Sequence, residues 1–189
     1  RTGFECYSLP DSPMTKAFEE GEAHYGAAGH QPGGRVNFIA VGSSSMSNLG
    51  NDYYAQNFYD LPSYKKALDN NMLPNFRGIK LSEDDKIRQH ATQQIRSYFK
   101  LDFNNFKDQF DIDFSKYFQT EISSLKEMID DELLIVSKDS ITLTDIGRDF
   151  TQNIMNIFDK YDPPNKSYRE RLETVKKAKE AQADILERL

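Results

Sequence analysis

The chain has 189 residues, of which 38% are hydrophobic and 12% aromatic, enough to bury the core of one ordinary domain or two small ones. The net charge of −6 argues against binding along a nucleic-acid backbone, and no apolar run approaches the roughly 20 residues that cross a membrane. A single cysteine, Cys6, excludes an internal disulfide and a multi-cysteine metal or cluster site within the chain, so a reducing, cytoplasmic compartment is expected.

The first 35 residues combine a predicted helix with a stretch rich in Gly and Ala. Pro13 is placed to begin a helix over residues 14–22, since proline is favoured in the first helical turn. His24 and His30 follow in what we expect to be loop or strand edge, and their spacing matches no metal-ligand pattern. The N-terminus has neither an initiator Met nor an apolar signal core, so we expect a piece of a longer protein.

The apolar run from Val36 to Val41 predicts a buried strand, and a Gly-Ser loop over residues 42–47 follows it. A loop at the carboxyl end of a buried parallel strand is where α/β proteins place ligands. Its backbone N–H groups could wrap an anion, but an ordinary loop is the simpler interpretation. Neither a P-loop nor a nucleophile elbow is present, and no catalytic residue is predicted.

Residues 51–82 are expected to be a connector. Tyrosines crowd its first part, and such segments commonly form packing surface but also line ligand pockets. A short helix is predicted over residues 61–70, with Pro62 in its first turn. A short strand is predicted from Phe76 to Leu81.

Residues 83–161 predict a separate, mostly helical unit. Ser82 and Asp85 resemble a capping box, and a helix follows with an apolar face at helical spacing, formed by Ile87, Ala91, Ile95, Tyr98 and Phe99. A turn and a short second helix are expected over residues 101–111. A third helix begins at Asp113 or Ser115, with an apolar face formed by Phe114, Phe118, Ile122, Leu125 and Ile129.

A hairpin and another helix complete this unit. Two β-rich runs around a Lys-Asp turn predict a hairpin over residues 133–144. Thr144 is expected to cap a final helix that ends before Pro163 and Pro164, with Ile146, Phe150, Ile154, Ile157 and Phe158 facing inward. This order resembles a winged-helix unit, but its third helix is not basic, so a structural or substrate-covering role is favoured over DNA binding. Residues 162–189 predict a charged helix with one weak apolar face.

Four short motifs resemble those of one known family. They are Y-A-Q-N at residues 54–57, R-G-I-x-L at residues 77–81, D-D-x-I-R at residues 84–88 and T-x-x-G-R at residues 144–148. In this register the chain resembles, from about Gly3 to Tyr161, the C-terminal portion of the oxygen-independent coproporphyrinogen III oxidases, which are radical S-adenosylmethionine enzymes of haem synthesis.

The resemblance implies a fold that is α/β plus mostly α. Residues 1–50 would be the end of a partial (β/α) barrel and residues 51–82 a connector. Residues 83–161 would be a helical, winged-helix-like domain with one β-hairpin that closes over the active site, and residues 162–189 a charged C-terminal helix.

The implied reaction is the oxidative decarboxylation of two propionates of coproporphyrinogen III to vinyl groups through a 5′-deoxyadenosyl radical. It requires S-adenosylmethionine and a 4Fe-4S cluster held by a C-x-x-x-C-x-x-C run. That run is absent here, so no metal ligand is assigned and the chain alone is not expected to be active. The expected partners are a tetrapyrrole substrate and an electron donor protein of unknown identity. Neither nucleic acid nor membrane is expected, and the protein is expected to be a monomer.

The resemblance also implies where a cofactor and a substrate would bind. Ile79 is expected to contact S-adenosylmethionine, and Gln56 and Tyr54 are assigned to the same pocket by motif position. Arg77 or Arg88 could pair with a substrate carboxylate, because Arg binds carboxylates bidentately. Alternatively, such an Arg holds Asp84 or Asp85 in a domain interface.

One segment departs from the family pattern. The family often has an acidic-His-aromatic run where this chain has Glu5, Cys6 and Tyr7. We therefore expect Cys6 to be a small buried residue without a catalytic role.

Two other interpretations are open. The chain could come from a haem- or tetrapyrrole-binding radical S-adenosylmethionine relative without oxidase activity, although the Y-A-Q-N and R-G-I motifs favour the oxidase. It could also be a winged-helix interaction module, for which the acidic composition predicts no affinity for nucleic acid.

Overall fold

The computed structural model describes residues 1–26, 29–33, 37–50 and 52–161, together with Lys177 and Glu180. The chain forms two compact units. The helical unit comprises Arg1–Gly34 and Glu83–Pro164, and the sheet unit comprises Arg35–Ser82 and Asn165–Leu189. The helix predicted over residues 162–189 lies outside the described residues, apart from the two single positions. Within the described ranges, no helix has both the length and the apolar character needed to cross a bilayer.

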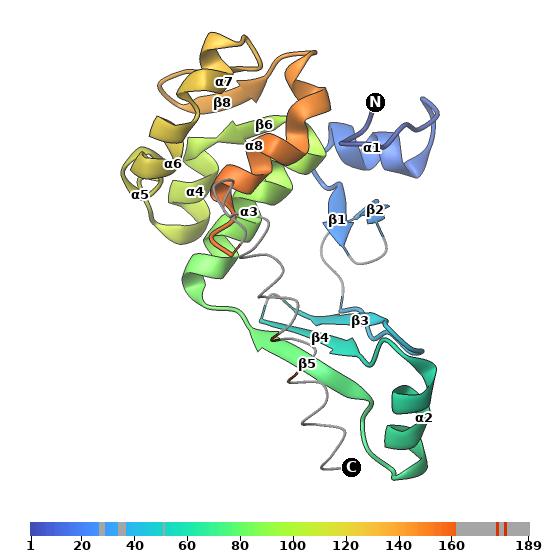
Figure 1. Cartoon of the computed structure of the whole chain (residues 1–189). Coiled ribbons are helices and arrows are strands. Elements are labelled where there is room, and N and C mark those ends of the chain that lie inside the picture. Colours follow the sequence, from blue (N-terminus) through green and yellow to red (C-terminus); the bar gives the residue numbers. More distant parts are fainter. Residues whose placement is uncertain (27–28, 34–36, 51, 162–176, 178–179, 181–189) are drawn as a thin grey trace. The chain divides into compact units, whose positions relative to one another are not determined.

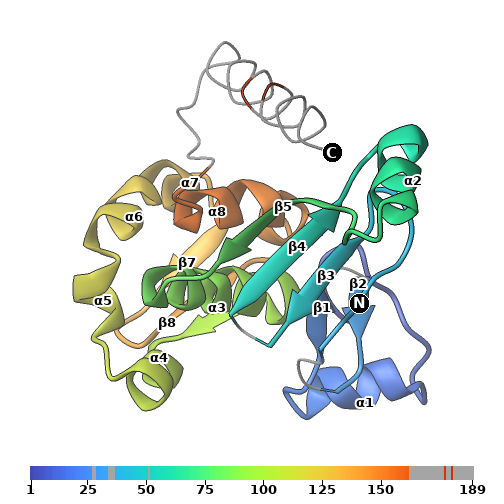
Figure 2. The same cartoon turned by 90° about the horizontal axis from the view of Figure 1, so that it is seen from below.

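An antiparallel sheet of three strands and one helix build the sheet unit (Figure 2). The strands lie in the order β3-β4-β5, and α2 connects β4 to β5. Their bounds are Met46–Leu49 for β3, Tyr53–Asn57 for β4, Leu61–Asp69 for α2 and Asn75–Lys80 for β5. The Asp60 carboxylate accepts a hydrogen bond from the Ser63 N–H at 2.8 Å, which caps α2 as its side-chain type favours. The predicted helix over residues 61–70 and the predicted strand near Phe76 are confirmed.

The prediction of a buried strand from Val36 to Val41 is wrong for the residues of this run that the structure describes. Only Phe38 forms an isolated bridge, with Asn48, and the side chains of Ile39 and Val41 are 76% and 87% exposed. The strand beside β4 is instead β3, which the sequence analysis assigned partly to the Gly-Ser loop. An apolar run shows that a segment can be buried but does not identify the segment that covers it.

Residues 52–82 are more than a connector, because β4 is the central strand of the sheet. Phe58, Ala67 and Phe76 form a small core in this unit, against which Tyr64 packs. Residues 37–50 belong to the same compact unit, and the expected domain boundary at residue 50 stays a prediction. Every strand pair among the described residues is antiparallel.

The helical unit begins with a capped helix and a small hairpin. Helix α1 spans Pro13–Glu19, and the Ser12 hydroxyl accepts a hydrogen bond from the Thr15 N–H at 3.2 Å. The predicted helix is thus confirmed, but it ends at Glu19, three residues before the predicted end at residue 22. Strands β1 (His24–Gly26) and β2 (Gly29–Gln31) pair as a hairpin where loop or strand edge was expected.

The remainder of the helical unit contains helices and a second antiparallel sheet of three strands, and α8 packs against α3 (Figure 1). The elements are α3 (Glu83–Tyr98), β6 (Lys100–Asp102), α4 (Phe103–Phe110), α5 (Phe114–Tyr117), α6 (Gln119–Ser124), α7 (Lys126–Asp130), β7 (Leu134–Val136), β8 (Ser140–Leu143), η1 (Gly147–Phe150) and α8 (Thr151–Phe158). The predicted hairpin is confirmed as β7 and β8, and β6, which the sequence analysis missed, pairs with β8 on its other side. The winged-helix assignment stays a prediction.

Aromatic side chains fill the core of the helical unit. The Phe114 ring stacks on Phe103 with centroids 4.4 Å apart and lies 4.7 Å from the Phe118 ring. Phe106, Phe114, Phe118 and Phe158 are all almost completely buried. Each such side chain contributes about 2 to 3 kcal/mol of transfer free energy, so these rings dominate the stability of the unit.

The prediction of one continuous third helix from Asp113 is wrong. The segment instead forms three short helices, α5, α6 and α7. Its apolar face is correct at Phe114, Phe118 and Leu125, which are buried. The hydroxyls of Ser123 and Ser124 donate to backbone carbonyls four residues earlier, and such bonds compete with the helical ladder and bend helices.

The final helix begins later than predicted. A 3-10 turn, η1, precedes α8, and the Thr144 hydroxyl accepts a hydrogen bond from the Gly147 N–H at 3.0 Å, so Thr144 caps the turn and not the helix. The tighter turn leaves Ile146 and Phe150 exposed, contrary to the prediction, whereas Ile154 is buried as expected, along with Ile157 and Phe158.

Gly147 permits a close contact that fixes this turn. A Cβ atom at this position would lie 1.7 Å from the Leu133 carbonyl oxygen, which belongs to the backbone and cannot rotate away. We expect Gly147→Ala to lower the free energy of unfolding by about 3 kcal/mol, measured by urea denaturation.

Gly26→Ala is the matched control for this substitution. A Cβ at Gly26 would meet only the His24 ring, at 3.5 Å, which is an ordinary van der Waals distance. Equal stability losses in the two variants would contradict the role assigned to the contact at Leu133.

Candidate functional site

Four of the five predicted site residues lie on one face of the sheet in the sheet unit. Tyr54 and Gln56 are on β4, and Arg77 and Ile79 are on β5. Gln56 is opposite Arg77, and Tyr54 is opposite Ile79. Directly opposed residues, and residues two positions apart on one strand, share a face of a sheet. The register therefore places all four side chains on the same face.

This face bounds a hollow of about 380 Å³, which we call the sheet hollow. It is lined by Met46, Tyr54, Ala55, Gln56, Arg77, Gly78 and Ile79. Its volume is in the range of small-ligand sites, and its lining combines apolar side chains with a few polar groups.

Gln56 holds the guanidinium of Arg77. Its side-chain oxygen accepts hydrogen bonds from Arg77 Nε, at 2.9 Å, from Arg77 Nη2, and from the Tyr59 hydroxyl, at 3.2 Å. Its side-chain nitrogen donates to the Ser44 carbonyl at 3.0 Å. The Gln56 amide is thus engaged within the protein, and its clearest role is to orient Arg77.

Aromatic rings fix the same guanidinium. The central carbon of Arg77 lies 5.0 Å from the Phe76 ring centroid and 5.6 Å from that of Tyr59, within the range of cation–π attraction. Within the described part of the chain, no carboxylate pairs with Arg77. An oriented positive charge that no described carboxylate compensates, at the edge of a hollow, is suited to bind a carboxylate.

Asn48, which the sequence analysis did not select, lies beside this site. It is opposite Tyr54 in the β3–β4 register, and its side-chain nitrogen donates to the Tyr54 hydroxyl at 3.3 Å. The side chain is 5% exposed, yet its oxygen has no hydrogen-bond partner among the described residues. No local sequence signal marks Asn48, because its burial depends on the pairing with β4.

The Gly-Ser loop offers little to an anion. The N–H of Gly42 donates to the Tyr64 hydroxyl at 3.1 Å, and the N–H of Ser44 donates to the Phe58 carbonyl at 2.7 Å. The hydroxyl of Ser45 donates to the Gly42 carbonyl at 2.7 Å. These contacts favour the interpretation as an ordinary loop.

Comparison with known proteins gives a match that lies mostly in the helical unit. The model of the HemN C-terminal domain matches residues 81–150. These residues are therefore similar to that domain.

Curated relatives extend the similarity beyond the HemN C-terminal domain. Oxygen-independent coproporphyrinogen III oxidase from Pseudomonas aeruginosa is 32% identical over 161 residues, covering 85% of this chain and 35% of the relative. The protein of that name from Synechocystis is 33% identical over 163 residues, covering 84% of this chain and 35% of the relative. The resemblance indicated by the motifs is thereby confirmed for the C-terminal portion, and the chain spans about a third of the length of these relatives.

A solved structure agrees with these sequence comparisons. It is the coproporphyrinogen III oxidase (HemN) of Escherichia coli, described as a radical SAM enzyme. It superposes with a TM-score of 0.77 at 32% identity, covering 82% of this chain and 35% of the other.

Arg88, the fifth predicted site residue, lies within the residues that match the HemN C-terminal domain. Its Nε donates to the Asp84 carboxylate at 3.1 Å, and its Nη1 donates to Glu121 at 2.9 Å and to the Phe158 carbonyl at 3.1 Å. These contacts favour the alternative that Arg88 holds Asp84 over the binding of a substrate carboxylate.

Asp84 is the centre of this network. Lys160 Nζ lies 2.6 Å from Asp84 and 2.7 Å from Asp85, and the Tyr117 hydroxyl donates to Asp84 at 2.6 Å. Burial by itself would raise the pKa of the Asp84 carboxyl, but the hydrogen bonds from Lys160 and Tyr117 and the charge of Arg88 lower it below its usual value. Burial and the bond to Asp84 raise the pKa of Tyr117 to about 12.

The histidine environments were compared with the patterns of metal ligands. His30 Nε2 lies 3.0 Å from the Phe4 carbonyl oxygen, and burial lowers the pKa of the ring. Among the residues described, no group of three or more His, Cys, Asp or Glu side chains could hold a metal ion. Cys6 is half-buried, and its sulfur accepts a hydrogen bond from the Thr2 hydroxyl at 3.4 Å, so the prediction of a small buried residue holds only in part.

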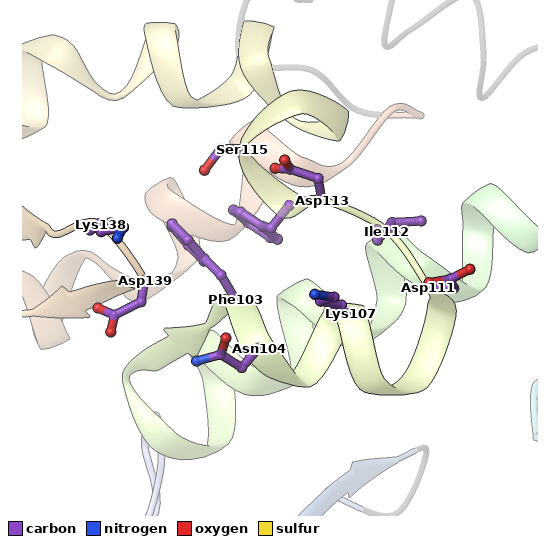
Figure 3. Close-up of a pocket in the computed structure, with 10 residues that line it drawn as sticks. Phe103, Asn104, Lys107, Asp111, Ile112, Asp113, Ser115, Lys138 and Asp139 are labelled. Carbon is purple, nitrogen blue, oxygen red and sulfur yellow. The ribbon is translucent and has the colours of Figure 1, made fainter.

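A second hollow, of about 460 Å³, lies in the helical unit around Phe103, and part of it falls in the turn between β7 and β8 (Figure 3). Its charged lining residues are of both signs, namely Lys107, Asp111, Asp113, Lys138 and Asp139. Asp113 already caps α5, and Asp139 already accepts from Ser137. None of the predicted site residues lines this hollow, and its mixed charge selects no ligand class.

The Asp84 network predicts a stability that depends on pH. We expect Asp84→Asn to lower the free energy of unfolding at neutral pH by about 1 to 2 kcal/mol, because Arg88 and Lys160 lose a charged partner. A carboxyl group whose pKa is lowered in the folded state stabilises the fold at pH values above its pKa in the unfolded state, which is about 3.9. This contribution is lost as the pH falls through the pKa of the folded state. Urea unfolding at several pH values should show the difference from the unmodified protein shrinking below about pH 4.

Asp69→Asn provides a control for this experiment. Asp69 pairs with Lys65 at 2.7 Å, but both side chains are exposed, and such pairs contribute about 0.5 kcal/mol or less. A destabilisation by Asp84→Asn that stayed constant into strong acid would show that the carboxylate charge is not its cause.

Proposed function

We propose that the protein containing this chain is an oxygen-independent coproporphyrinogen III oxidase. It would decarboxylate two propionates of coproporphyrinogen III to vinyl groups in haem synthesis. The proposal rests on one observation above all. Tyr54, Gln56, Arg77 and Ile79, chosen by resemblance alone, line one hollow in a chain that is 32% identical to an enzyme of this name.

The proposed division of labour follows the family. Residues 1–50 would complete a partial (β/α) barrel, and residues 51–82, which include the strands β4 and β5, would lead from it to the next part. Residues 83–161 would form a winged-helix-like domain that covers the active site, with the charged segment 162–189 after it.

The iron–sulfur cluster does not fit this chain. The sequence contains a single cysteine, and the described residues offer no cluster of His, Cys, Asp or Glu side chains that could replace thiolates. We therefore propose that the cluster ligands lie outside these 189 residues, and we assign no reaction step to the cluster here.

S-adenosylmethionine fits the sheet hollow. Exposed apolar surface at Ile79 and Met46 can pack against its uncharged part. When bound in the complete enzyme, S-adenosylmethionine supplies the 5′-deoxyadenosyl group that becomes the radical. The residues of this chain bind and orient it and exclude water from the sheet face.

Arg77 is the proposed carboxylate-binding residue. Gln56, Tyr59 and Phe76 fix its guanidinium, so little side-chain entropy is lost when a carboxylate binds. The carboxylate can come from a propionate of the tetrapyrrole or from the methionine end of S-adenosylmethionine.

The test of the activity uses the complete protein. It is expressed without oxygen, loaded with its cluster and incubated with coproporphyrinogen III and S-adenosylmethionine, and the porphyrins are separated by chromatography. We expect protoporphyrinogen IX as product. A fully loaded enzyme that forms no product contradicts the proposal, and tight stoichiometric haem binding without decarboxylation would support the haem-binding alternative.

Arg77→Met should reduce kcat/KM about 10- to 100-fold, because it removes the oriented charge. Lys80→Met is the matched control, since Lys80 is a cation on the same strand but on the opposite face, opposite Tyr53. Equal losses in the two variants would mean that general charge, and not the geometry at Arg77, is responsible.

A further inference from the structure

Asn57, the last residue of the Y-A-Q-N motif, holds the Gly-Ser loop against the end of β4. Its side chain is 5% exposed. The side-chain nitrogen donates to the Gly42 carbonyl at 2.9 Å and to the Ser45 hydroxyl at 3.0 Å, and the side-chain oxygen accepts from Asn75 at 2.9 Å. The Asn57 backbone N–H donates to the Ser45 carbonyl at 3.0 Å. Asn57 therefore ties two points of the loop to the sheet.

Between these two points, Ser44 has a backbone conformation that few side chains adopt. Its φ is +60°, in the left-handed region, which is unfavourable for residues other than glycine and persists only where the surroundings enforce it. The Ser44 N–H donates to the Phe58 carbonyl at 2.7 Å. The hydrogen bonds at Asn57 and Phe58 thus hold Ser44 in this conformation.

The carbonyl of Ser44 orients the side-chain amide of Gln56. It accepts from the Gln56 side-chain nitrogen at 3.0 Å. Gln56 is 9% exposed, so this nitrogen would lose a buried acceptor if the loop moved. A Gln amide has donors on one side and an acceptor on the other, so fixing its nitrogen at Ser44 directs its oxygen toward Arg77, whose Nε donates to it at 2.9 Å.

Arg77 depends on this amide because its own side chain is exposed. An exposed arginine samples many rotamers, and binding a carboxylate costs the entropy of selecting one of them. A hydrogen bond that restricts the guanidinium before binding lowers this cost. The contacts that provide this restriction run from Asn57 through Ser44 and Gln56 to Arg77.

We propose that Asn57 is a positioning residue for the binding of a carboxylate by Arg77. It fixes the Gly-Ser loop so that the Ser44 carbonyl orients the Gln56 amide, and the amide orients the guanidinium. This inference rests on the proposed function for the role of Arg77. It gives the Gly-Ser loop a part in the site that requires no ligand on the loop itself.

The test is a double-mutant cycle in the complete protein. Dissociation constants for S-adenosylmethionine and for coproporphyrinogen III are measured by calorimetry without oxygen, and the ligand that Arg77→Met weakens is the source of the carboxylate. Asn57→Ala should weaken binding of that ligand about fivefold, because orientation is lost while the charge remains. In the Arg77→Met background the same substitution should have no further effect, since residues that act through one another are not additive.

Two substitutions of Ser44 test the backbone step separately. Both leave the Ser44 carbonyl in the chain. Glycine adopts a positive φ without strain, whereas a β-branched side chain is strongly disfavoured there. Ser44→Val should therefore bind the carboxylate ligand at least about threefold more weakly than the conservative variant Ser44→Gly.

Asn70→Ala is the control for a general loss of stability. The Asn70 side chain donates to the Lys66 carbonyl at 2.8 Å at the end of α2, so its removal should lower the melting temperature without changing either dissociation constant. Thermal melts of all variants identify any that is unfolded. If Asn57→Ala does not fold, the comparison of the two Ser44 variants still decides the inference.

Three outcomes would overturn the inference. They are unchanged affinity in Asn57→Ala, an equal loss in the presence and absence of Arg77, and equal affinities of the two Ser44 variants. Unchanged affinity for both ligands in Arg77→Met refutes the role of Arg77 and the inference together.

Failure of the inference is distinguishable from failure of the proposed function. An enzyme that decarboxylates coproporphyrinogen and whose binding depends on Arg77 but not on Asn57 refutes the inference alone. A protein that shows the coupling between Asn57 and Arg77 but forms no product refutes the oxidase assignment alone.

Discussion

The pairing register of β4 with β5 determines which side chains reach the sheet hollow. Because side chains alternate between the two faces of a strand, a slip of one residue would send Gln56 and Arg77 to opposite faces. Gly78 allows the close approach of the strands at this point, since a Cβ there would lie 3.1 Å from the Tyr54 carbonyl oxygen. A bulge between Gln56 and Asn57 ends the regular pairing directly after the site. The candidate binding face thus depends on backbone geometry before it depends on any side chain.

The two arginines first assigned to substrate binding differ in how their charges are balanced. Arg77 is held by a neutral amide and two rings, which orient the guanidinium without neutralising it. Arg88 is held by the carboxylates of Asp84 and Glu121, which neutralise it within the fold. A guanidinium already paired with two carboxylates gains little from a third, whereas one held by neutral partners keeps its attraction for an anion. Orientation without neutralisation is what distinguishes a binding arginine from a structural one here.

Several residues of the family motifs serve the fold. In the T-x-x-G-R motif, the Thr144 hydroxyl donates to the Glu132 carbonyl at 2.8 Å and accepts from Gly147, whose own contact with Leu133 leaves no room for a side chain. The guanidinium carbon of Arg148 lies 5.1 Å from the Phe99 ring centroid. A motif therefore identifies a family without identifying a binding site, and the surroundings of each residue must decide its role.

The sequence by itself determined the elements whose signals are local. Helical spacing predicted α3, turn chemistry predicted the β7–β8 hairpin, and motif resemblance selected four residues that share one hollow. Only the tertiary structure decided that β3, and not the apolar run before it, lies beside β4, and that the segment after Asp113 breaks into short helices. It alone revealed the contact between Arg88 and Glu121, which are 33 residues apart in the chain. The physical reason is that periodicity records which face of a segment avoids water, whereas burial, charge balance and hydrogen-bond satisfaction depend on which distant segment covers that face.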